Sequence, residues 1–188
     1  KDNRLLAQTV IIKLNGGLGT GMGLEGAKSL LPIKSGLTFL DFIAKHILHL
    51  RRQFDVPLRF LLMNSFSTSA DTLRHLRHYP ELGPVEHLEL MQGLVPKVDA
   101  KTLRPVEWLP NPQLEWCPPG HGDLYPSLLG SGWLDRLLAE GVRYAFVSNS
   151  DNLGASLDLG LLTYFAESDK SFLMEVPERT EADKKGGH

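Results

Sequence analysis

The sequence predicts an α/β sandwich with a largely parallel sheet, because strand-like and helix-like segments alternate along the chain. Short apolar, β-branched segments have the composition of buried strands, and the segments between them carry apolar residues at helical spacing. A glycine-rich motif and a polar motif each follow an expected strand. Ligands of parallel α/β sheets bind at the carboxyl ends of strands, so these motifs are candidates for the functional site.

The first half of the chain begins with a β-branched strand and continues with a long helix. Thr38 is expected as the N-cap of that helix with Asp41 at its third position, close to a capping box. The expected elements of this half are strand 9–14, helix 38–54, strand 58–63, helix 69–78 and strand 87–91. Four histidines are expected on solvated helix faces, namely His46, His49, His75 and His78.

The second half starts with a proline-punctuated excursion at 95–108, which is expected to form a hairpin around Ala100 and Lys101. Asp123 is expected to cap the helix that follows, and Gly141 is expected to end the next one. The expected elements are helix 124–129, helix 132–140, strand 142–147, helix 157–168 and strand 171–176.

The glycine-rich segment after the first strand predicts a phosphate-binding turn. Five glycines lie between positions 16 and 23, and Lys28 follows them. Glycine lets the backbone turn sharply against a ligand, and consecutive N–H groups form a concavity that binds anions. Lys28 adds a mobile positive charge. The spacing fits neither a Walker loop nor the dinucleotide fingerprint, whose third glycine falls on Met22. The alternative is a surface turn.

A second motif runs from Trp116 to Asp123, with the sequence W-C-P-P-G-H-G-D. Two prolines make it rigid before Gly120, and two glycines loosen it around His121. A histidine in a loop is usually structural or exposed, but this setting favours a functional imidazole.

A third motif, S-N-S-D-N-L-G-A at 148–155, follows the strand expected at 142–147. Asp151 therefore lies where α/β sheets place ligand and metal groups. The alternative is structural, with Asp151 or Asn152 capping the helix expected at 157–168.

The composition restricts the class of protein. The 188 residues suit one domain, and a net charge of −2 gives no general electrostatic footprint for nucleic acid. Cys117 is the one cysteine, so no intrachain disulfide forms and a reducing, cytoplasmic setting is expected. No apolar run has the length of a membrane span. Because the chain stops in an apparent loop, we expect it to be a catalytic domain, residues 1–188, truncated at its C-terminus.

The three motifs together resemble the eukaryotic-type UDP-glucose pyrophosphorylases, also called UTP–glucose-1-phosphate uridylyltransferases. The resemblance covers Leu14–Gly23 with Lys28-Ser29, the segment P-P-G-H-G-D, and the segment 148–155. The chain departs from the family pattern at Gly21, where serine is usual, and at Ala27, where proline is usual. The resemblance implies a Rossmann-like three-layer α/β/α sandwich with a mixed, largely parallel sheet, of the nucleotide-diphospho-sugar transferase type.

The same resemblance implies roles for individual residues. Lys28 and Asp151 are the expected catalytic residues, and Asp151 is the expected ligand of a Mg²⁺ cofactor. The expected nucleotide-binding residues are Leu14, Asn15, Gly16, Gly17, Lys28, Gln92, Gly120 and Asn149. The expected sugar-phosphate-binding residues are Gly16, Gly17, His121, Asn149, Ser150 and Asp151.

The implied reaction joins UTP and glucose 1-phosphate to give UDP-glucose and pyrophosphate. One alternative is a pyrophosphorylase for another sugar 1-phosphate, although the N-acetylglucosamine relatives carry an arginine after the threonine of the glycine loop, where this chain has Gly21-Met22. The other is a non-catalytic uridine-nucleotide-binding domain, because the family's second lysine would lie beyond residue 188. The sequence leaves the oligomeric state open.

Overall fold

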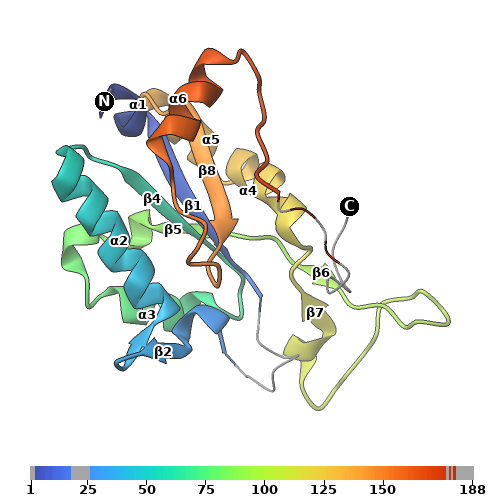
Figure 1. Ribbon diagram of the computed structural model, residues 1–188. Coiled ribbons are helices and arrows are strands. Elements are labelled where there is room, and N and C mark those ends of the chain that lie inside the picture. Colours follow the sequence, from blue (N-terminus) through green and yellow to red (C-terminus); the bar gives the residue numbers. More distant parts are fainter. Residues whose placement is uncertain (1–2, 18–25, 177, 179, 181–188) are drawn as a thin grey trace. The chain divides into compact units, whose positions relative to one another are not determined.

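The computed structural model describes residues 3–17, 26–176, 178 and 180. The chain divides into two compact units, Lys1–Leu157 and Asp158–His188. The first unit contains the sheet and the three sequence motifs (Figure 1). Within the part of the chain that the structure describes, no helix is long and apolar enough to cross a membrane.

The first unit is built on a four-stranded parallel sheet. Its strands lie in the order β5 (Glu89–Met91), β4 (Arg59–Asn64), β1 (Thr9–Asn15) and β8 (Tyr144–Asn149). β1 pairs in parallel with β4 on one side and with β8 on the other (Figure 1). The predicted parallel sheet is confirmed, and the carboxyl ends of its strands meet at one edge.

The apolar run of β1 is buried on both faces, as is typical of a central parallel strand. The helices that cover the sheet are α2 (Phe39–Phe54), α3 (Ser69–Leu76), α4 (Leu124–Gly130) and α5 (Trp133–Ala139). Val10 and Ile12 belong to the cluster formed with α4 and α5, whereas Ile11 lies on the other face with Ile43 of α2. Figure 1 shows α2 and α3 on one side of the sheet and α4 and α5 on the other, which confirms the three layers.

Short elements account for several differences from the expectation. The helix α1 (Asn3–Ala7) and the antiparallel pair of β2 (Pro32–Lys34) with β3 (Leu37–Thr38) were not predicted. Ser35 and Gly36 both have positive φ, which is the geometry of a tight hairpin turn. The 3-10 helices within the described residues are η2 (Lys28–Leu30), η3 (Pro80–Leu82), η4 (Val85–His87), η5 (Pro112–Glu115) and η6 (His121–Asp123).

The proline-punctuated excursion turns back on itself as predicted, with Val98 bridged to Pro105. At the start of this segment, β6 (Val95–Pro96) pairs antiparallel with β7 (Trp116–Cys117), a strand pair that was not predicted. The predicted cap at Asp123 is wrong, because its backbone is helical rather than extended and its side chain bonds no helix N–H. Its carboxylate instead accepts hydrogen bonds from the Gly93 N–H at 2.7 Å and the Ser127 hydroxyl at 2.9 Å.

The second unit contains α6 (Leu159–Glu167). Asp158 caps this helix, since its carboxylate accepts a hydrogen bond of 2.8 Å from the Leu161 N–H. The capping alternative for Asp151 and Asn152 is therefore wrong. The predicted strand at 171–176 is also wrong, because these residues are irregular and form no strand.

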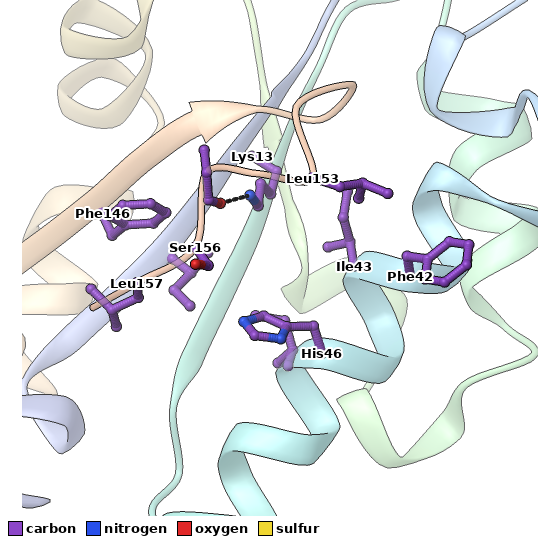
Figure 2. Close-up of a pocket in the computed structure, with 11 residues that line it drawn as sticks. Lys13, Phe42, Ile43, His46, Phe146, Leu153, Ser156 and Leu157 are labelled. Carbon is purple, nitrogen blue, oxygen red and sulfur yellow. Dashed lines mark hydrogen bonds between the residues drawn. The ribbon is translucent and has the colours of Figure 1, made fainter. Parts of the chain in front are cut away.

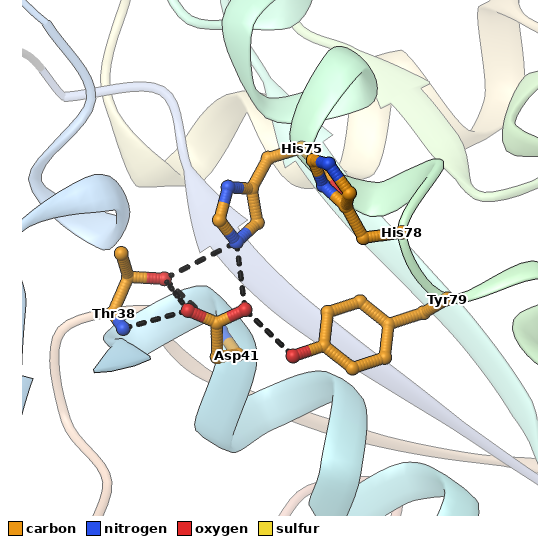
Figure 3. A network of polar contacts seen from close by, with 5 residues as sticks. All are labelled: Thr38, Asp41, His75, His78 and Tyr79. Atoms are coloured by element: carbon orange, nitrogen blue, oxygen red, sulfur yellow. Dashed lines mark hydrogen bonds and ion pairs between the residues drawn. The ribbon is translucent and has the colours of Figure 1, made fainter. Parts of the chain in front are cut away.

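The start of α2 is held by a polar network around Asp41 (Figure 3). Thr38 and Asp41 form the predicted capping box, in which the Asp41 N–H donates to the Thr38 hydroxyl and the Thr38 N–H donates to the Asp41 carboxylate at 2.7 Å. The other carboxylate oxygen lies 2.8 Å from His75 Nε2 and accepts a 2.6 Å hydrogen bond from the Tyr79 hydroxyl. The expectation that His75 is merely solvated is wrong, because this contact ties α3 to α2.

These contacts hold the Asp41 carboxylate in its charged form. Burial by itself would raise the pKa, but the hydrogen bonds from Tyr79, Thr38 and His75 outweigh it and hold the pKa of Asp41 well below 3.8. The same arrangement, burial together with the Asp41 charge, raises the pKa of Tyr79 to about 12.

We expect Asp41→Ala to lower the free energy of unfolding by about 2–3 kcal/mol at neutral pH, since it leaves several buried donors without an acceptor. A carboxylate whose folded pKa is depressed stabilises the protein above its unfolded pKa, and the contribution is lost as pH falls. The difference between wild type and variant should therefore shrink below about pH 4.

Urea unfolding of both proteins at a series of pH values measures this difference. The control is Asp71→Ala, which removes an exposed carboxylate on α3 paired with Arg74 and should change stability by less than about 0.5 kcal/mol. A difference for Asp41→Ala that does not depend on pH would contradict the assignment.

Candidate functional site

An ion pair between Lys28 and Asp151 lies at the carboxyl edge of the sheet. Lys28 Nζ is 3.5 Å from Asp151 Oδ2, and the two side chains are 39% and 37% exposed. An ion pair this exposed contributes little to stability. The two predicted catalytic residues, distant in sequence, are thus brought together where a ligand can reach them.

Lys28 is placed by the 3-10 helix η2 and the residue before it. It opens η2, and the residue before it, Ala27, is buried with φ −62°. Proline would impose nearly the same φ. The alanine at this position therefore keeps the backbone conformation that the family's proline would enforce.

Asp151 is placed by the turn that follows β8. The Ser150 N–H donates to the Leu14 carbonyl at 3.0 Å, which carries the β1–β8 pairing one residue past the strand. Asn152 closes the turn, because its side-chain oxygen accepts a 3.2 Å hydrogen bond from the Ala155 N–H. Asn149, the last residue of β8, pairs with Leu14 and has an exposed side chain.

A chain of buried and half-buried polar side chains joins the four strands beneath this edge. The Ser150 hydroxyl donates to Asn15 Oδ1 at 2.8 Å, and Asn15 Nδ2 donates to Asn64 Oδ1 at 2.7 Å. Asn64 Nδ2 then donates to Glu89 Oε1 at 2.7 Å. The side chains of Asn15 and Ser150 are thus bonded within the framework, and the backbone N–H of Ser150 is bonded to the Leu14 carbonyl.

The glycine turn begins at this framework. The name covers the two described residues of the predicted phosphate loop, Gly16 and Gly17. The Gly16 carbonyl accepts a 2.8 Å hydrogen bond from the Ser65 hydroxyl, and Gly17 is exposed. The rest of the predicted phosphate loop, 18–25, lies outside the described residues.

Gln92 packs directly against the glycine turn. Its side chain is 5% exposed, and a Cβ added to Gly16 would collide with its Oε1 atom. Its Nε2 atom donates to the Gly120 carbonyl at 2.7 Å. Gly120 has φ +113°, a conformation that favours glycine. Gln92 thus connects the end of β5, the glycine turn and the histidine motif.

His121 lies next to this connection on η6, with an exposed side chain. The bond from Gly93 to Asp123 holds the segment at its other end. The structure therefore brings the glycine turn, Gln92 and Gly120 together, places His121 directly after Gly120, and pairs Lys28 with Asp151.

Asp151 is also the residue that could hold a metal. Among the described residues no group of three or more His, Cys, Asp or Glu side chains forms a metal cage. Mg²⁺ does not need one, since it keeps several waters and is bound by one or two carboxylates together with substrate phosphates. A single exposed carboxylate near a glycine turn fits that mode of binding.

Sequence reasoning missed Lys13, Asn64 and Ser65. Lys13 is 6% exposed and donates to the Ser148 hydroxyl at 2.7 Å and to the Ala155 carbonyl at 3.0 Å. Burial lowers the pKa of Lys13 to about 8. The signal was present, because a lysine interrupts an apolar run of the first strand. Asn64 and Ser65 carry no such signal, since polar residues after a strand are common.

Comparison with known proteins places the chain in a family. The model of the family described as UTP–glucose-1-phosphate uridylyltransferase matches residues 1–188. A UTP–glucose-1-phosphate uridylyltransferase of Solanum tuberosum is 45% identical over 188 residues, which are 100% of this chain and 39% of the relative. A probable enzyme of the same name from Schizosaccharomyces pombe is 43% identical over 183 residues, or 97% of this chain and 36% of the relative.

Solved structures agree with the sequence comparison. The crystal structure of a UDP-glucose phosphorylase from Trypanosoma brucei has a TM-score of 0.95 at 55% identity and is covered over 41% of its chain. A mutant UDP-glucose pyrophosphorylase from Leishmania major, crystallised in complex with UDP-Glc, has a TM-score of 0.92 at 54% identity and is covered over 40%. Each covers 100% of this chain, which spans about two fifths of these relatives. With a family model matched from end to end and the motifs of the site at one edge of the sheet, the chain belongs to the UTP–glucose-1-phosphate uridylyltransferase family.

Proposed function

We propose that the protein carrying this chain makes UDP-glucose and pyrophosphate from UTP and glucose 1-phosphate, with Mg²⁺ as cofactor. The observation that carries the proposal is the Lys28–Asp151 pair beside the glycine turn at the carboxyl edge of the sheet. Family membership and the relative from Leishmania major in complex with UDP-Glc support it.

The reaction explains why the site offers charges rather than a strong base. The attacking oxygen of glucose 1-phosphate is already an anion, so no proton has to be removed. Transfer at the α-phosphorus needs alignment and neutralisation of the charge on the phosphate oxygens. In this proposal Lys28 neutralises those oxygens, and the backbone of Leu14–Gly17 holds the nucleotide.

Asp151 has the complementary role. A phosphate group that takes Lys28 as its partner leaves the Asp151 carboxylate with an uncompensated negative charge. That carboxylate would then hold Mg²⁺, which when bound supplies positive charge next to the α-phosphate. The exchange of partners accounts for an ion pair too exposed to be explained by stability.

Gln92 and Gly120 form the proposed uracil site. A glutamine amide offers one acceptor and two donors, and one Nε2 donor is used by the Gly120 carbonyl. The other donor and Oε1 remain suited to the alternating donors and acceptors of a uracil edge. Gly120 lacks a side chain, so a flat base can lie on it. His121 and Asn149, both exposed, would contact the sugar phosphate.

The full-length protein tests the proposal directly. Incubation with UTP, glucose 1-phosphate and Mg²⁺ should release pyrophosphate and UDP-glucose, with galactose 1-phosphate and N-acetylglucosamine 1-phosphate as competing substrates. Preference for another sugar would replace the proposed substrate. Binding of UDP-glucose without turnover would replace the enzyme with a binding protein.

We expect Lys28→Ala and Asp151→Asn each to lower turnover of the full-length enzyme by about 10²-fold or more, because each removes a charge that acts on the phosphates. Both variants should unfold within about 1 kcal/mol of wild type, since the pair is exposed. Asp151→Asn should also raise the Mg²⁺ concentration needed for half-maximal rate.

Two exposed residues supply matched controls. Lys34→Ala removes a lysine from β2, and Asp158→Asn changes the cap of α6 to another good N-cap. Both should leave turnover unchanged. Normal kinetics for Lys28→Ala would contradict its role in neutralising the phosphates. An unshifted Mg²⁺ requirement for Asp151→Asn would contradict its role as a metal ligand.

We expect Gln92→Ala to reduce the preference for UTP over CTP and ATP by about tenfold, the equivalent of about 1.4 kcal/mol of lost discrimination. Gly16→Ala should act in the same direction by displacing the Gln92 side chain. Competition assays measure the preference, with the exposed Gln113→Ala as control. Retention of the UTP preference in Gln92→Ala assigns uracil recognition to other residues.

A further inference from the structure

Lys13 is a buried cation on the central strand of the sheet. It is 6% exposed, and its Nζ atom donates to the Ser148 hydroxyl at 2.7 Å and to the Ala155 carbonyl at 3.0 Å. The ring centroid of Phe146 lies 5.8 Å from the same atom. No carboxylate among the described residues forms an ion pair with it.

A buried lysine without a carboxylate partner destabilises a fold, because the charge loses its hydration. The lowered pKa of Lys13 reflects this loss of hydration. An apolar residue at this position would suit a central strand better. The lysine therefore calls for an explanation other than the stability of the sheet.

Both hydrogen bonds of Lys13 run to β8 and the turn that carries Asp151. Ser148 is the register partner of Lys13 on β8, and Ala155 ends the third motif. At its near end the turn is held by Ser150, which bonds the Leu14 carbonyl and the Asn15 side chain. Consecutive residues of β1 thus hold the turn at both ends, with Asp151 between them.

A cavity beside the turn explains why the far end needs such a bond. The cavity has a volume of about 170 Å³ and lies between α2 and the turn (Figure 2). Its wall is largely apolar and includes Phe42, Ile43, Leu153 and Leu157. His46 on α2 also lines it, and burial with the charges of Lys13 and His49 lowers its pKa. Without the bond from Lys13, the side chain of Leu153 could move further into this space.

We propose that Lys13 is a positioning residue, which fixes the turn 150–155 so that Asp151 stays opposite Lys28. Among the described residues no hydrogen bond or ion pair joins Lys13 to Lys28 or Asp151, so Lys13 acts through the backbone of the turn. The proposal concerns the catalytic step and rests on the proposed function. The glycine turn directly follows β1, so we expect nucleotide binding by this turn not to depend on Lys13.

The test is Lys13→Met in the full-length enzyme, since methionine keeps the length of the side chain and removes its charge and donors. We expect kcat to fall about 10- to 100-fold, because a small displacement of a catalytic group has effects of this size. The KM for UTP should change less than about threefold, and the melting temperature should stay level or rise, because replacing a buried charge by an apolar group is often stabilising.

A double-mutant cycle separates positioning from general damage. Lys13→Met introduced into Asp151→Asn should lower kcat by less than about twofold further, since its effect passes through Asp151. Ser148→Ala should give a smaller loss than Lys13→Met, because it removes one of the two acceptors. The control is Lys45→Met on the exposed face of α2, which should match wild type. A full, independent loss in the Asp151→Asn background would overturn the proposal.

Amide hydrogen exchange supplies a readout that does not need activity. In Lys13→Met the turn 150–155 should exchange faster, while α2 and β4 keep the protection of wild type. Unchanged exchange in the turn overturns the positioning role even if kcat falls. If wild type makes no UDP-glucose, the proposed function fails, and faster exchange confined to the turn still shows that Lys13 holds it.

Discussion

The parallel pairing of β1 between β4 and β8 is the constraint on which the rest of the structure depends. It brings the carboxyl ends of three strands, far apart in the sequence, to one edge. The glycine turn leaves β1 there, and the Asp151 turn leaves β8 beside it. A slip of one residue in either register would turn every side chain to the other face. Such a slip would break the cross-strand hydrogen bonds of Lys13 and Asn15, so the polar residues of β1 fix the register and with it the geometry of the site.

The polar residues at this edge of the sheet fall into two groups, a buried hydrogen-bonded framework and a pair of exposed charged side chains. Asn15, Asn64 and Ser150 are buried and satisfy one another, because an unpaired polar group in the interior is costly. Lys28 and Asp151 remain partly exposed. The same neighbourhood therefore holds buried amides that define positions and exposed charges, and in the proposed function these charges bind a phosphate and a metal.

The two lysines of this region show how burial changes the role of one side chain. Lys28 is exposed and paired with a carboxylate, so its partner can be exchanged for a phosphate oxygen. Lys13 is buried, and its partners are a hydroxyl and a carbonyl of β8 and the turn after it. A buried ammonium cannot exchange its partners without moving the chain around it. The first is therefore suited to chemistry and the second to holding the backbone on which the chemistry depends.

Local features of the sequence determined the alternation of strands and helices, the capping box at Thr38 and the turn within residues 98–105, because each depends on neighbouring residues. The three motifs also indicated the family. Tertiary structure alone decided the strand order, the contact of Lys28 with Asp151, the partners of Asp41 and Asp123, and the burial of Lys13. These depend on hydrogen bonds between residues distant in sequence, which leave no periodic pattern. The strand predicted at 171–176 is irregular for a related reason, because an apolar composition alone does not decide whether a segment forms a strand.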